Sequence, residues 1–335
     1  MDSSLSTNKV IVTGADGFLG SNIVRELISR GYEVYCFIQS GRDAITLNDL
    51  PVKKYYGDLN NSEDLIPLFR ECDYLIHTAG QTAVWPRNLP SSWDVNYRAV
   101  KNLAGLVKEF GIKRFVHIGT ATSFGPGTLK NPGTERSPYS SARLGVDYLD
   151  SKFIAQEYLV EKAESEGLPV IILNPTFMLG AYDSGNGSNK MILEIYRQRI
   201  PGYTGGGKNY VHVKDVAVAA SNALTMGNTG ECYIVGNQNL PYREAFNLIA
   251  GTLNVRPPKI PLPKFIAISY GALNLLKYWF TGSAPTVSCI MARIACAEYY
   301  YSSEKAVTDL KISYTPLQNA ITESIEWFKS QGLAS

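Results

Sequence analysis

Short apolar runs alternate with segments of helical periodicity through the first half of the chain. Residues 9–13 are mostly β-branched, and residues 18–30 then carry apolar side chains at the spacing of an amphipathic helix, which Gly31 ends. Further strands are predicted at 32–38, 52–56, 73–77, 114–118 and 169–173, and further helices at 62–70 (capped by Ser62), 93–110 and 146–166. Strands that alternate with helices predict a parallel sheet covered on both faces.

The pattern is less regular after residue 175. Helices are predicted at 191–199 and 240–253, a strand leads to His212, and residues 231–235 are expected to rejoin the main sheet. Residues 265–280 form the most apolar late stretch, which is too short to span a bilayer and is interpreted as an amphipathic helix. Packing against the core is the favoured role for that helix, and lining an apolar substrate entrance is the alternative.

The composition indicates a globular protein with a sizeable core, since 45% of its 335 residues are hydrophobic and 19% are charged. The net charge is +2 and basic residues are scattered, so neither nucleic acid nor an anionic membrane is expected as a partner. Five dispersed cysteines favour reduced thiols, and three dispersed histidines argue against a metal site. Residues 1–8 lack the apolar core of a signal peptide, and no transmembrane segment is predicted, so a cytoplasmic location is expected.

A glycine-rich loop joins the first strand to the first helix. It reads Gly14-Ala15-Asp16-Gly17-Phe18-Leu19-Gly20, a GxxGxxG spacing in the strand–loop–helix context of a dinucleotide fingerprint. Glycines let backbone amides approach a phosphate, and the helix N-terminus adds partial positive charge. A tight turn without a ligand is the alternative, and we favour a pyrophosphate site formed by Gly14, Asp16, Gly17, Phe18, Leu19 and Gly20.

Small and polar residues also follow the later strands. In parallel sheets with helices on both faces, ligands bind at the carboxyl ends of the strands. The cofactor site is therefore expected to include Asp58, Leu59, Thr78, Ala79, Gly80, Asn174, Pro175 and Thr176. Asp58 is expected to accept a hydrogen bond from the adenine amino group, with a plain strand-end cap as the alternative, and Leu59 to pack on the ring.

These features predict an α/β fold: a Rossmann-like doubly wound parallel sheet with a smaller, mostly helical C-terminal substrate lobe. Residues 1–175 and about 209–236 are expected to form the dinucleotide-binding domain. Residues 176–208 and 237–335 are expected to form the substrate lobe, with the substrate in the cleft between them.

The end of the second predicted strand bears on the choice between NADP and NAD. A carboxylate there would bind the ribose diol of NAD, but Glu33 comes too early and Asp43 lies past the turn. Arg42 is placed where it can bind a 2′-phosphate. NADP is therefore the predicted cofactor, and NAD is the alternative.

Tyr148 and Lys152 lie four residues apart in the predicted helix 146–166, so their side chains share one face. A nearby ammonium favours the phenolate and lowers the pKa of a tyrosine, which can then transfer a proton near neutral pH. Taken without its context, the Tyr148 and Lys152 pair would fit a helix face exposed to solvent. Its setting after the strand-end residues favours a catalytic pair.

Several motifs occur in a fixed order along the chain: TGADGFLG at 13–20, GDL at 57–59, HTAG at 77–80, DVNYRAVKNL at 94–103 and YLDSKFIAQEYL at 148–159. Together they resemble the extended short-chain dehydrogenase/reductase superfamily, also called the NAD-dependent epimerase/dehydratase superfamily, over nearly the whole chain. Within it, the chain most resembles the dihydroflavonol reductase-like group, which is close to the 3-beta-hydroxysteroid dehydrogenases.

The resemblance implies a set of catalytic residues. Tyr148 matches the acid/base, Lys152 the lysine that binds the nicotinamide ribose, and Thr120 the hydroxyl residue after the fifth strand. Thr122 and Ser123 are rivals for the last position, and a β-branched strand residue is the structural alternative for Thr120. Asn96 matches an asparagine that supports a proton-relay water in related enzymes, although plain helix packing is equally compatible. His212 matches a structural position.

The implied function is NADP-dependent reduction of a small-molecule ketone or aldehyde, apolar or aromatic, with Tyr148 as the general acid. A nucleotide-sugar epimerase or dehydratase and a 3-beta-hydroxysteroid-type dehydrogenase are the alternatives. Nucleotide-sugar enzymes usually have an arginine at the position that Lys208-Asn209 occupies in this chain. Dehydratases often have an acidic residue beside the catalytic threonine, and Ala121-Thr122 contains none. A monomer or homodimer is expected. Predicted substrate-lining residues are Trp85, Phe124, Phe177, Met178, Tyr182 and Tyr203.

Overall fold

The computed structural model describes residues 8–184, 187–285 and 287–334, so the expectation for the N-terminal segment lies almost wholly outside the described residues. At its centre is a seven-stranded sheet of order β10-β6-β5-β4-β1-β2-β3, in which every neighbouring pair is parallel. The predicted doubly wound parallel sheet is confirmed. Its strands are β1 (Lys9–Thr13), β2 (Glu33–Gln39), β3 (Lys53–Gly57), β4 (Tyr74–His77), β5 (Arg114–Ile118), β6 (Val170–Pro175) and β10 (Cys232–Val235).

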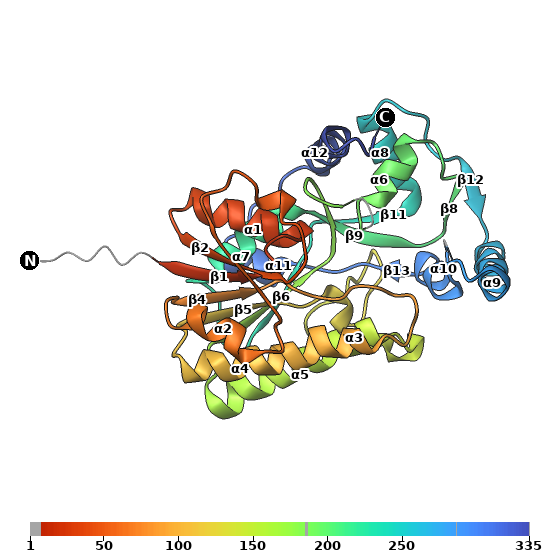
Figure 1. Cartoon of the computed structure of the whole chain (residues 1–335). Helices are drawn as coiled ribbons and strands as arrows, with labels where there is room; N and C mark the ends of the chain where they lie inside the picture. The colour runs from red at the N-terminus through yellow and green to blue at the C-terminus, as the bar shows by residue number, and fades with distance from the viewer. Residues whose placement is uncertain (1–7, 185–186, 286, 335) are drawn as a thin grey trace, which may run out of the picture.

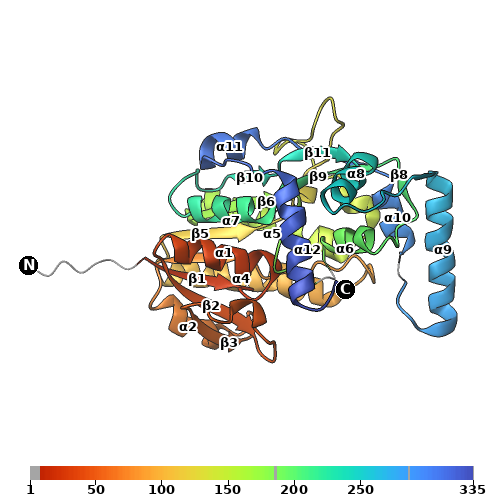
Figure 2. The same cartoon turned by 90° about the horizontal axis from the view of Figure 1, so that it is seen from above.

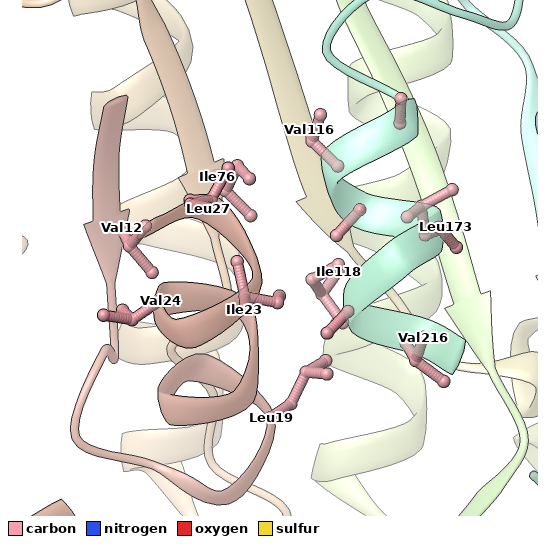
Figure 3. Close-up of a cluster of buried hydrophobic side chains, with 14 of the residues drawn as sticks. Val12, Leu19, Ile23, Val24, Leu27, Ile76, Val116, Ile118, Leu173 and Val216 are labelled. Atoms are coloured by element: carbon pink, nitrogen blue, oxygen red, sulfur yellow. The ribbon is translucent and has the colours of Figure 1, made fainter. Parts of the chain in front are cut away.

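Helices cover both faces of this sheet (Figure 1). One face carries α1 (Phe18–Ser29) and α7 (Val213–Asn222), and the other carries α2 (Ser62–Phe69), α4 (Ala99–Glu109) and α5 (Asp147–Glu166). Successive side chains of a strand point to opposite faces, so Val10 and Val12 join the core under α1 and α7, whereas Ile11 joins the core under α2, α4 and α5. Figure 3 shows the first of these cores, with side chains of α1, α7 and four strands in contact.

A second group of elements lies at the end of the molecule opposite the N-terminus (Figures 1 and 2). Strand β9 (Gly207–His212) pairs with β7 (Phe177–Leu179), β11 (Gln238–Pro241) and β13 (Glu298–Tyr299), and β8 (Gly202–Thr204) pairs with β12 (Ile260–Leu262). A core cluster joins this sheet to three helices, α6 (Lys190–Tyr196), α8 (Tyr242–Thr252) and α12 (Leu317–Ser330). The remaining helices include α10 (Cys289–Ala295) and α11 (Glu304–Leu310). The proposed division into two domains stays a prediction.

Several helix boundaries differ from the predicted ones, and three of the differences have a local reason. Asn61, not Ser62, caps α2, because its side-chain oxygen accepts the Glu63 backbone N–H at 3.3 Å. The helix predicted over 93–110 is divided into α3 (Pro90–Trp93), a π-helical turn at Asp94–Arg98 and α4. The helix predicted from residue 240 begins at Tyr242, since residues 240 and 241 belong to β11.

The role favoured for the helix at 265–280 is wrong. Helix α9 (Lys264–Thr281) forms where it is predicted, but Gly271 is its one buried residue, and Trp279 and Phe280 are 79% and 83% exposed. Its inner side packs on α10, and Tyr278 makes an edge-to-face contact with Trp85, with ring centroids 5.8 Å apart. Among the described residues, no helix has both the length and the apolar character needed to cross a bilayer.

Candidate active site

A long cleft follows the carboxyl ends of the main-sheet strands. Its volume is about 1580 Å³, above the roughly 300–1,000 Å³ of a pocket for one small ligand. The glycine loop, the residues that follow β2 to β6, the start of α5, and parts of α10 and α12 line it. The cleft therefore has room for a dinucleotide and a second, smaller molecule.

The glycine loop has the close packing that a phosphate cradle needs. Gly14 has a φ of +66°, and a Cβ at this position would lie 2.7 Å from the backbone of Ala79. A Cβ at Gly20 would lie 2.1 Å from the Gly14 carbonyl oxygen, so the first turn of α1 packs directly on the loop. Gly17 is the N-cap of α1, and the helix N-terminus borders the cleft. This arrangement fits a dinucleotide pyrophosphate.

Charged residues lie at the end of the cleft next to β2 and β3. The Arg42 Nε forms an ion pair with Asp16 Oδ2 at 2.9 Å, in which the carboxylate is buried and the guanidinium is exposed. This pair neutralises the carboxylate beside the glycine loop and engages one nitrogen of the guanidinium. Asp58 and Leu59 also line the cleft, and the Asp58 carboxylate accepts the Asn60 backbone N–H at 2.9 Å.

The turn after β4 connects the glycine loop to the middle of the cleft. The Thr78 hydroxyl donates to the carbonyl oxygen of Thr13 at 2.7 Å, which fixes the ends of β4 and β1 together. Thr78, Ala79 and Gly80 all line the cleft. A Cβ at Gly80 would lie 3.2 Å from Lys152 Nζ and 3.3 Å from Asn96 Oδ1, so the backbone, the amine and the amide meet there.

Three predicted catalytic side chains border the same part of the cleft. Tyr148 lies in the first turn of α5 and Lys152 one turn later, and both line the cleft with Thr120. The buried Lys152 ammonium donates to the carbonyl oxygen of Ile118 at 2.8 Å, which anchors it at the end of β5. The Thr120 hydroxyl lies 2.9 Å from that of Thr122, which also lines the cleft. The rival Thr122 therefore shares the site.

Burial is the main influence on the pKa values of Tyr148 and Lys152. It lowers the pKa of Lys152 to about 8. Burial also raises the pKa of Tyr148, and a hydrogen bond with Thr120 opposes that rise. The expectation of a lowered tyrosine pKa is thus wrong for the ligand-free chain, because desolvation of the phenolate is the largest effect. Near pH 7 the cleft therefore contains a protonated phenol and an ammonium that can lose its proton.

Two histidines under the cleft are neutral. His77 of β4 and His117 of β5 pair across the sheet, with ring centroids 5.4 Å apart. Burial, followed by the charge of Lys152, lowers the pKa of His77 to about 3 and that of His117 well below its ordinary value. Because neither ring is charged at neutral pH, neither repels the Lys152 ammonium.

A buried amide network supports α5 from below. The Asn96 side chain, in the π-helical turn, donates to the Ser151 hydroxyl at 3.0 Å and to the Gln81 carbonyl at 2.9 Å. Its oxygen accepts the Gln81 backbone N–H at 2.9 Å. The π-helical turn therefore places Asn96 against α5 beside Lys152, a position compatible with a packing role and with a proton relay.

The chain is similar to known proteins over most of its length. The model of the NAD dependent epimerase/dehydratase family matches residues 10–236, a span that contains the glycine loop, Thr120, Tyr148 and Lys152. The chain belongs to this family.

Relatives in the family are reductases and dehydrogenases by name. A protein named "Putative dihydroflavonol 4-reductase" from Synechocystis sp. PCC 6803 is 26% identical over 96% of this chain and 94% of that protein. A 3 beta-hydroxysteroid dehydrogenase/Delta 5→4-isomerase from Mycobacterium tuberculosis is 24% identical over 98% and 93%. A 2-alkyl-3-oxoalkanoate reductase from Stenotrophomonas maltophilia is 25% identical over 97% and 100%. The chain is accordingly an NAD(P)-dependent oxidoreductase.

A solved structure has the same overall fold. The crystal structure of gox2253 superposes with a TM-score of 0.85 at 26% identity and covers 98% of this chain and all of that one. The resemblance to extended short-chain dehydrogenases, and within them to the dihydroflavonol reductase-like and hydroxysteroid dehydrogenase group, is therefore confirmed.

One predicted cofactor residue of this family member lies under the cleft and not on its wall. The fully buried Asn174 side chain donates to the carbonyl oxygen of Thr120 at 3.0 Å and to Gln156 Oε1 at 2.7 Å. It faces α5 because alternate residues of β6 point to opposite sides of the sheet. Asn174 therefore orients Thr120, whereas Pro175 and Thr176 line the cleft as predicted.

The six predicted substrate residues separate into two groups. Phe177, Met178 and Tyr182 line the cleft, and the Tyr182 ring packs between Arg25 and Trp327. The other three are wrong as lining residues in the described part of the chain. Phe124 is buried in the core under α2, α4 and α5. Tyr203 packs against the core cluster that joins β9 to α6, α8 and α12, and Trp85 packs on Tyr278 of α9.

Sequence reasoning missed several cleft residues from the second half of the chain. Lys208 of β9 lines the cleft with its ammonium 4.3 Å from the centre of the Phe177 ring. Burial lowers the pKa of Lys208 to about 8, and no acidic side chain of the described residues lies within ion-pair distance of it. Further missed lining residues include Met291, Ile294, Tyr299, Tyr301 and Trp327 from this half, and Val84 from the first half. The signal available for Lys208 was its place before the Tyr-Val-His strand.

Proposed function

We propose that this oxidoreductase reduces a ketone or aldehyde to an alcohol with NADPH, and that Tyr148 is the general acid. The observation that supports this most is the meeting of Tyr148, Thr120 and Lys152 on one cleft that also contains the glycine loop. A protonated phenol beside a hydroxyl is suited to a carbonyl oxygen on which negative charge develops. Bound NADPH would supply the hydride.

Each residue has a separate task in this proposal. The glycine loop would hold the pyrophosphate, and Thr78 to Gly80 would lie along the nicotinamide ribose. Thr120 would donate to the carbonyl oxygen, and Tyr148 would transfer its proton to the oxygen as the alcohol forms. The Lys152 ammonium, held by the Ile118 carbonyl, would stabilise the phenolate that remains. Asn96 and Ser151 keep α5 in position for both side chains.

The direct test is the loss of NADPH absorbance with a panel of aromatic and aliphatic carbonyl compounds. Reduction of at least one compound, with recovery of the alcohol, is the expected result. A nucleotide-sugar epimerase or dehydratase would instead bind UDP- or dTDP-sugars without net consumption of NADPH. A hydroxysteroid-type dehydrogenase would show oxidation of a secondary alcohol with NAD or NADP as its faster direction.

Lys208 favours a substrate that carries a carboxylate. An ammonium partly withdrawn from water is stabilised by an anionic partner, and among the described residues none is within ion-pair distance. Phe177 packs against that ammonium, and Met291 and Ile294 add apolar wall to the same cleft. A relative is named for reduction of an oxoalkanoate, a carbonyl compound of this type. We therefore propose an apolar oxo acid as the substrate.

Replacement of Lys208 with methionine is expected to remove the preference for the acid. The ratio of kcat/KM for an oxo acid to that for its methyl ester should fall about 10- to 100-fold, the usual worth of a hydrogen bond to a charged group. In the parent protein this ratio should also fall as the pH rises through about 8, because Lys208 loses its proton there. The measurement is NADPH oxidation with each member of the pair.

Lys214→Met is the matched control for that variant. Lys214 pairs with Glu323 at 2.6 Å at the start of α7, where an exposed ion pair contributes little. The Lys214→Met variant should leave the ratio of kcat/KM for the oxo acid to kcat/KM for its methyl ester unchanged. If the parent protein reduces the acid and the ester with equal kcat/KM, the proposal that the substrate carries a carboxylate is rejected. The proposed carbonyl reduction would still stand.

Arg42→Ala is expected to weaken the binding of NADPH more than that of NADH. Loss of a charged contact to the 2′-phosphate should raise the Kd of NADPH about 10- to 100-fold, whereas the Kd of NADH should change by less than about threefold. The variant also leaves Asp16 without its ion pair. The resulting small repulsion acts on both dinucleotides alike and does not change the difference between them. Fluorescence titration with both cofactors measures the two constants. Arg42→Lys should retain most of the preference, and equal losses for both cofactors would favour NAD.

A further inference from the structure

Helix α9 exposes an apolar face at the edge of the molecule. Phe265, Leu273, Trp279 and Phe280 are 71%, 64%, 79% and 83% exposed, and Ile266, Tyr270 and Leu276 are also exposed. Figure 2 shows α9 at the margin opposite the N-terminus, with α10 as its nearest helical neighbour. Burial of large apolar side chains is favourable, so a face of this composition favours contact with an apolar partner.

The packing of α9 onto the protein uses only its opposite side. At Gly271, a Cβ would lie 2.9 Å from the backbone nitrogen of Cys289, so this side of α9 lies close against the start of α10. Tyr278 completes the contact through Trp85. Exposed apolar residues follow one another at intervals of three and four along the outer side of the helix: Ile266, Tyr270, Leu273, Leu276 and Phe280.

The chain segment that contains α9 carries charge of one sign. From residue 245 to residue 297 the chain contains no Asp or Glu, although a stretch of this length would hold about five at the average frequency of the whole sequence. The same stretch contains five basic residues, all with exposed side chains: Arg256, Lys259, Lys264, Lys277 and Arg293. The net charge of +2 for the whole chain conceals this local excess.

We propose that α9 binds the surface of an anionic lipid bilayer and lies in the interface without crossing it. Exposed Trp, Tyr and Phe beside Lys are typical of interfacial helices, whose apolar face enters the headgroup boundary while lysines contact anionic lipids. Charge favours this partner over a second copy of the chain. In a two-fold contact the basic residues of one α9 would meet those of the other, and no acidic residue of the stretch would compensate them.

The position of α9 connects this surface to the cleft. Helix α10, on which α9 packs, contributes Met291 and Ile294 to the cleft wall, and Trp85 follows the lining residue Val84. Binding through α9 would hold the apolar part of the cleft next to the bilayer. This consequence for substrate access rests on the proposed function, whereas the bilayer contact does not.

The test is co-sedimentation of the full chain with vesicles. Vesicles of phosphatidylcholine are compared with vesicles in which part of this lipid is replaced with phosphatidylglycerol. The expected result is binding at least tenfold stronger to the anionic vesicles, which weakens as salt is added. No binding to anionic vesicles would overturn the proposal, and the proposed reductase function would stand, because carbonyl reduction is measured separately.

Variants separate the apolar and electrostatic contributions. Trp279→Ser/Phe280→Ser and Lys264→Glu/Lys277→Glu should each weaken binding to anionic vesicles at least tenfold and leave circular dichroism and NADPH affinity unchanged. The matched control is Leu129→Ser/Lys130→Glu, an exposed apolar and basic pair elsewhere on the surface, which should bind like the parent protein. The bilayer proposal would be overturned if the α9 variants bound anionic vesicles like the parent protein. It would also be overturned if an α9 variant turned a dimer into a monomer without changing vesicle binding.

Discussion

Replacement of Tyr148 with phenylalanine should lower kcat about 10²- to 10⁴-fold and leave the Kd of NADPH within about threefold of the parent value. The range is that of a lost general acid. The phenol touches the apolar cluster formed by Val146, Leu149 and Ile290, and phenylalanine keeps this contact. Steady-state rates with a carbonyl compound that the parent protein reduces give kcat. A fluorescence titration with NADPH gives the Kd.

Tyr139→Phe is the matched control for this result. The Tyr139 hydroxyl donates to Asp150 at 2.6 Å from another side of α5, and its ring stacks on Phe153. Loss of that hydroxyl should cost about 1 kcal/mol of stability and leave kcat unchanged. Turnover by Tyr148→Phe at the parent rate would show that another group supplies the proton. Thr122, which shares a hydrogen bond with Thr120, would be the first to examine.

The parts of the site that the sequence predicts are those set by local geometry. The glycine loop lies within a few residues between a strand and a helix, so its spacing indicates its shape, and Gly14 and Gly20 have the close approaches that such a loop needs. Tyr148 and Lys152 are one turn apart on α5, which helical periodicity requires. Position at the carboxyl end of a strand likewise placed Thr78 and Thr120 on the cleft.

The errors occur where a side chain's direction depends on its partners. Position in a loop near the cleft does not fix where an aromatic ring points. Phe124 turns into the core under α2, α4 and α5, and Tyr203 turns into the core cluster between β9 and the helices α6, α8 and α12. Asn174 is different, because alternation along β6 from the buried Ile172 already indicates that it faces α5. Strand alternation should therefore be applied to strand-end residues before they are assigned to a site.

Residues of the second half needed the tertiary structure. Lys208 reaches the cleft because β9 pairs with β7, which begins just after β6, and with β13, which lies almost a hundred residues later in the chain. Periodicity predicted α9 but not what its apolar side contacts. A run of more than fifty residues without an acid was visible in the sequence, and only the exposure of α9 gives that run a structural meaning.

Lys152→Met should lower kcat/KM about 10²-fold or more at pH 7 and, with a neutral substrate, remove its dependence on pH above 8. Burial lowers the pKa of Lys152 to about 8, so the ammonium is present below that pH and is lost as the pH rises through it. Burial raises the pKa of Tyr148, so the phenol keeps its proton over the same range. In the parent protein kcat/KM should therefore be level below pH 8 and fall above it, because the phenolate loses its stabilising charge.

Lys208 titrates in the same range, so the experiment needs a background without it. In Lys208→Met, with the neutral methyl ester as substrate, the fall of kcat/KM above pH 8 should remain. Adding Lys152→Met to this variant should abolish that fall and lower kcat/KM at pH 7. Methionine fills much of the volume of lysine and leaves the Ile118 carbonyl without its donor, so a melting curve accompanies the rates. A fall that persists in the double variant would assign the titration to a group other than Lys152.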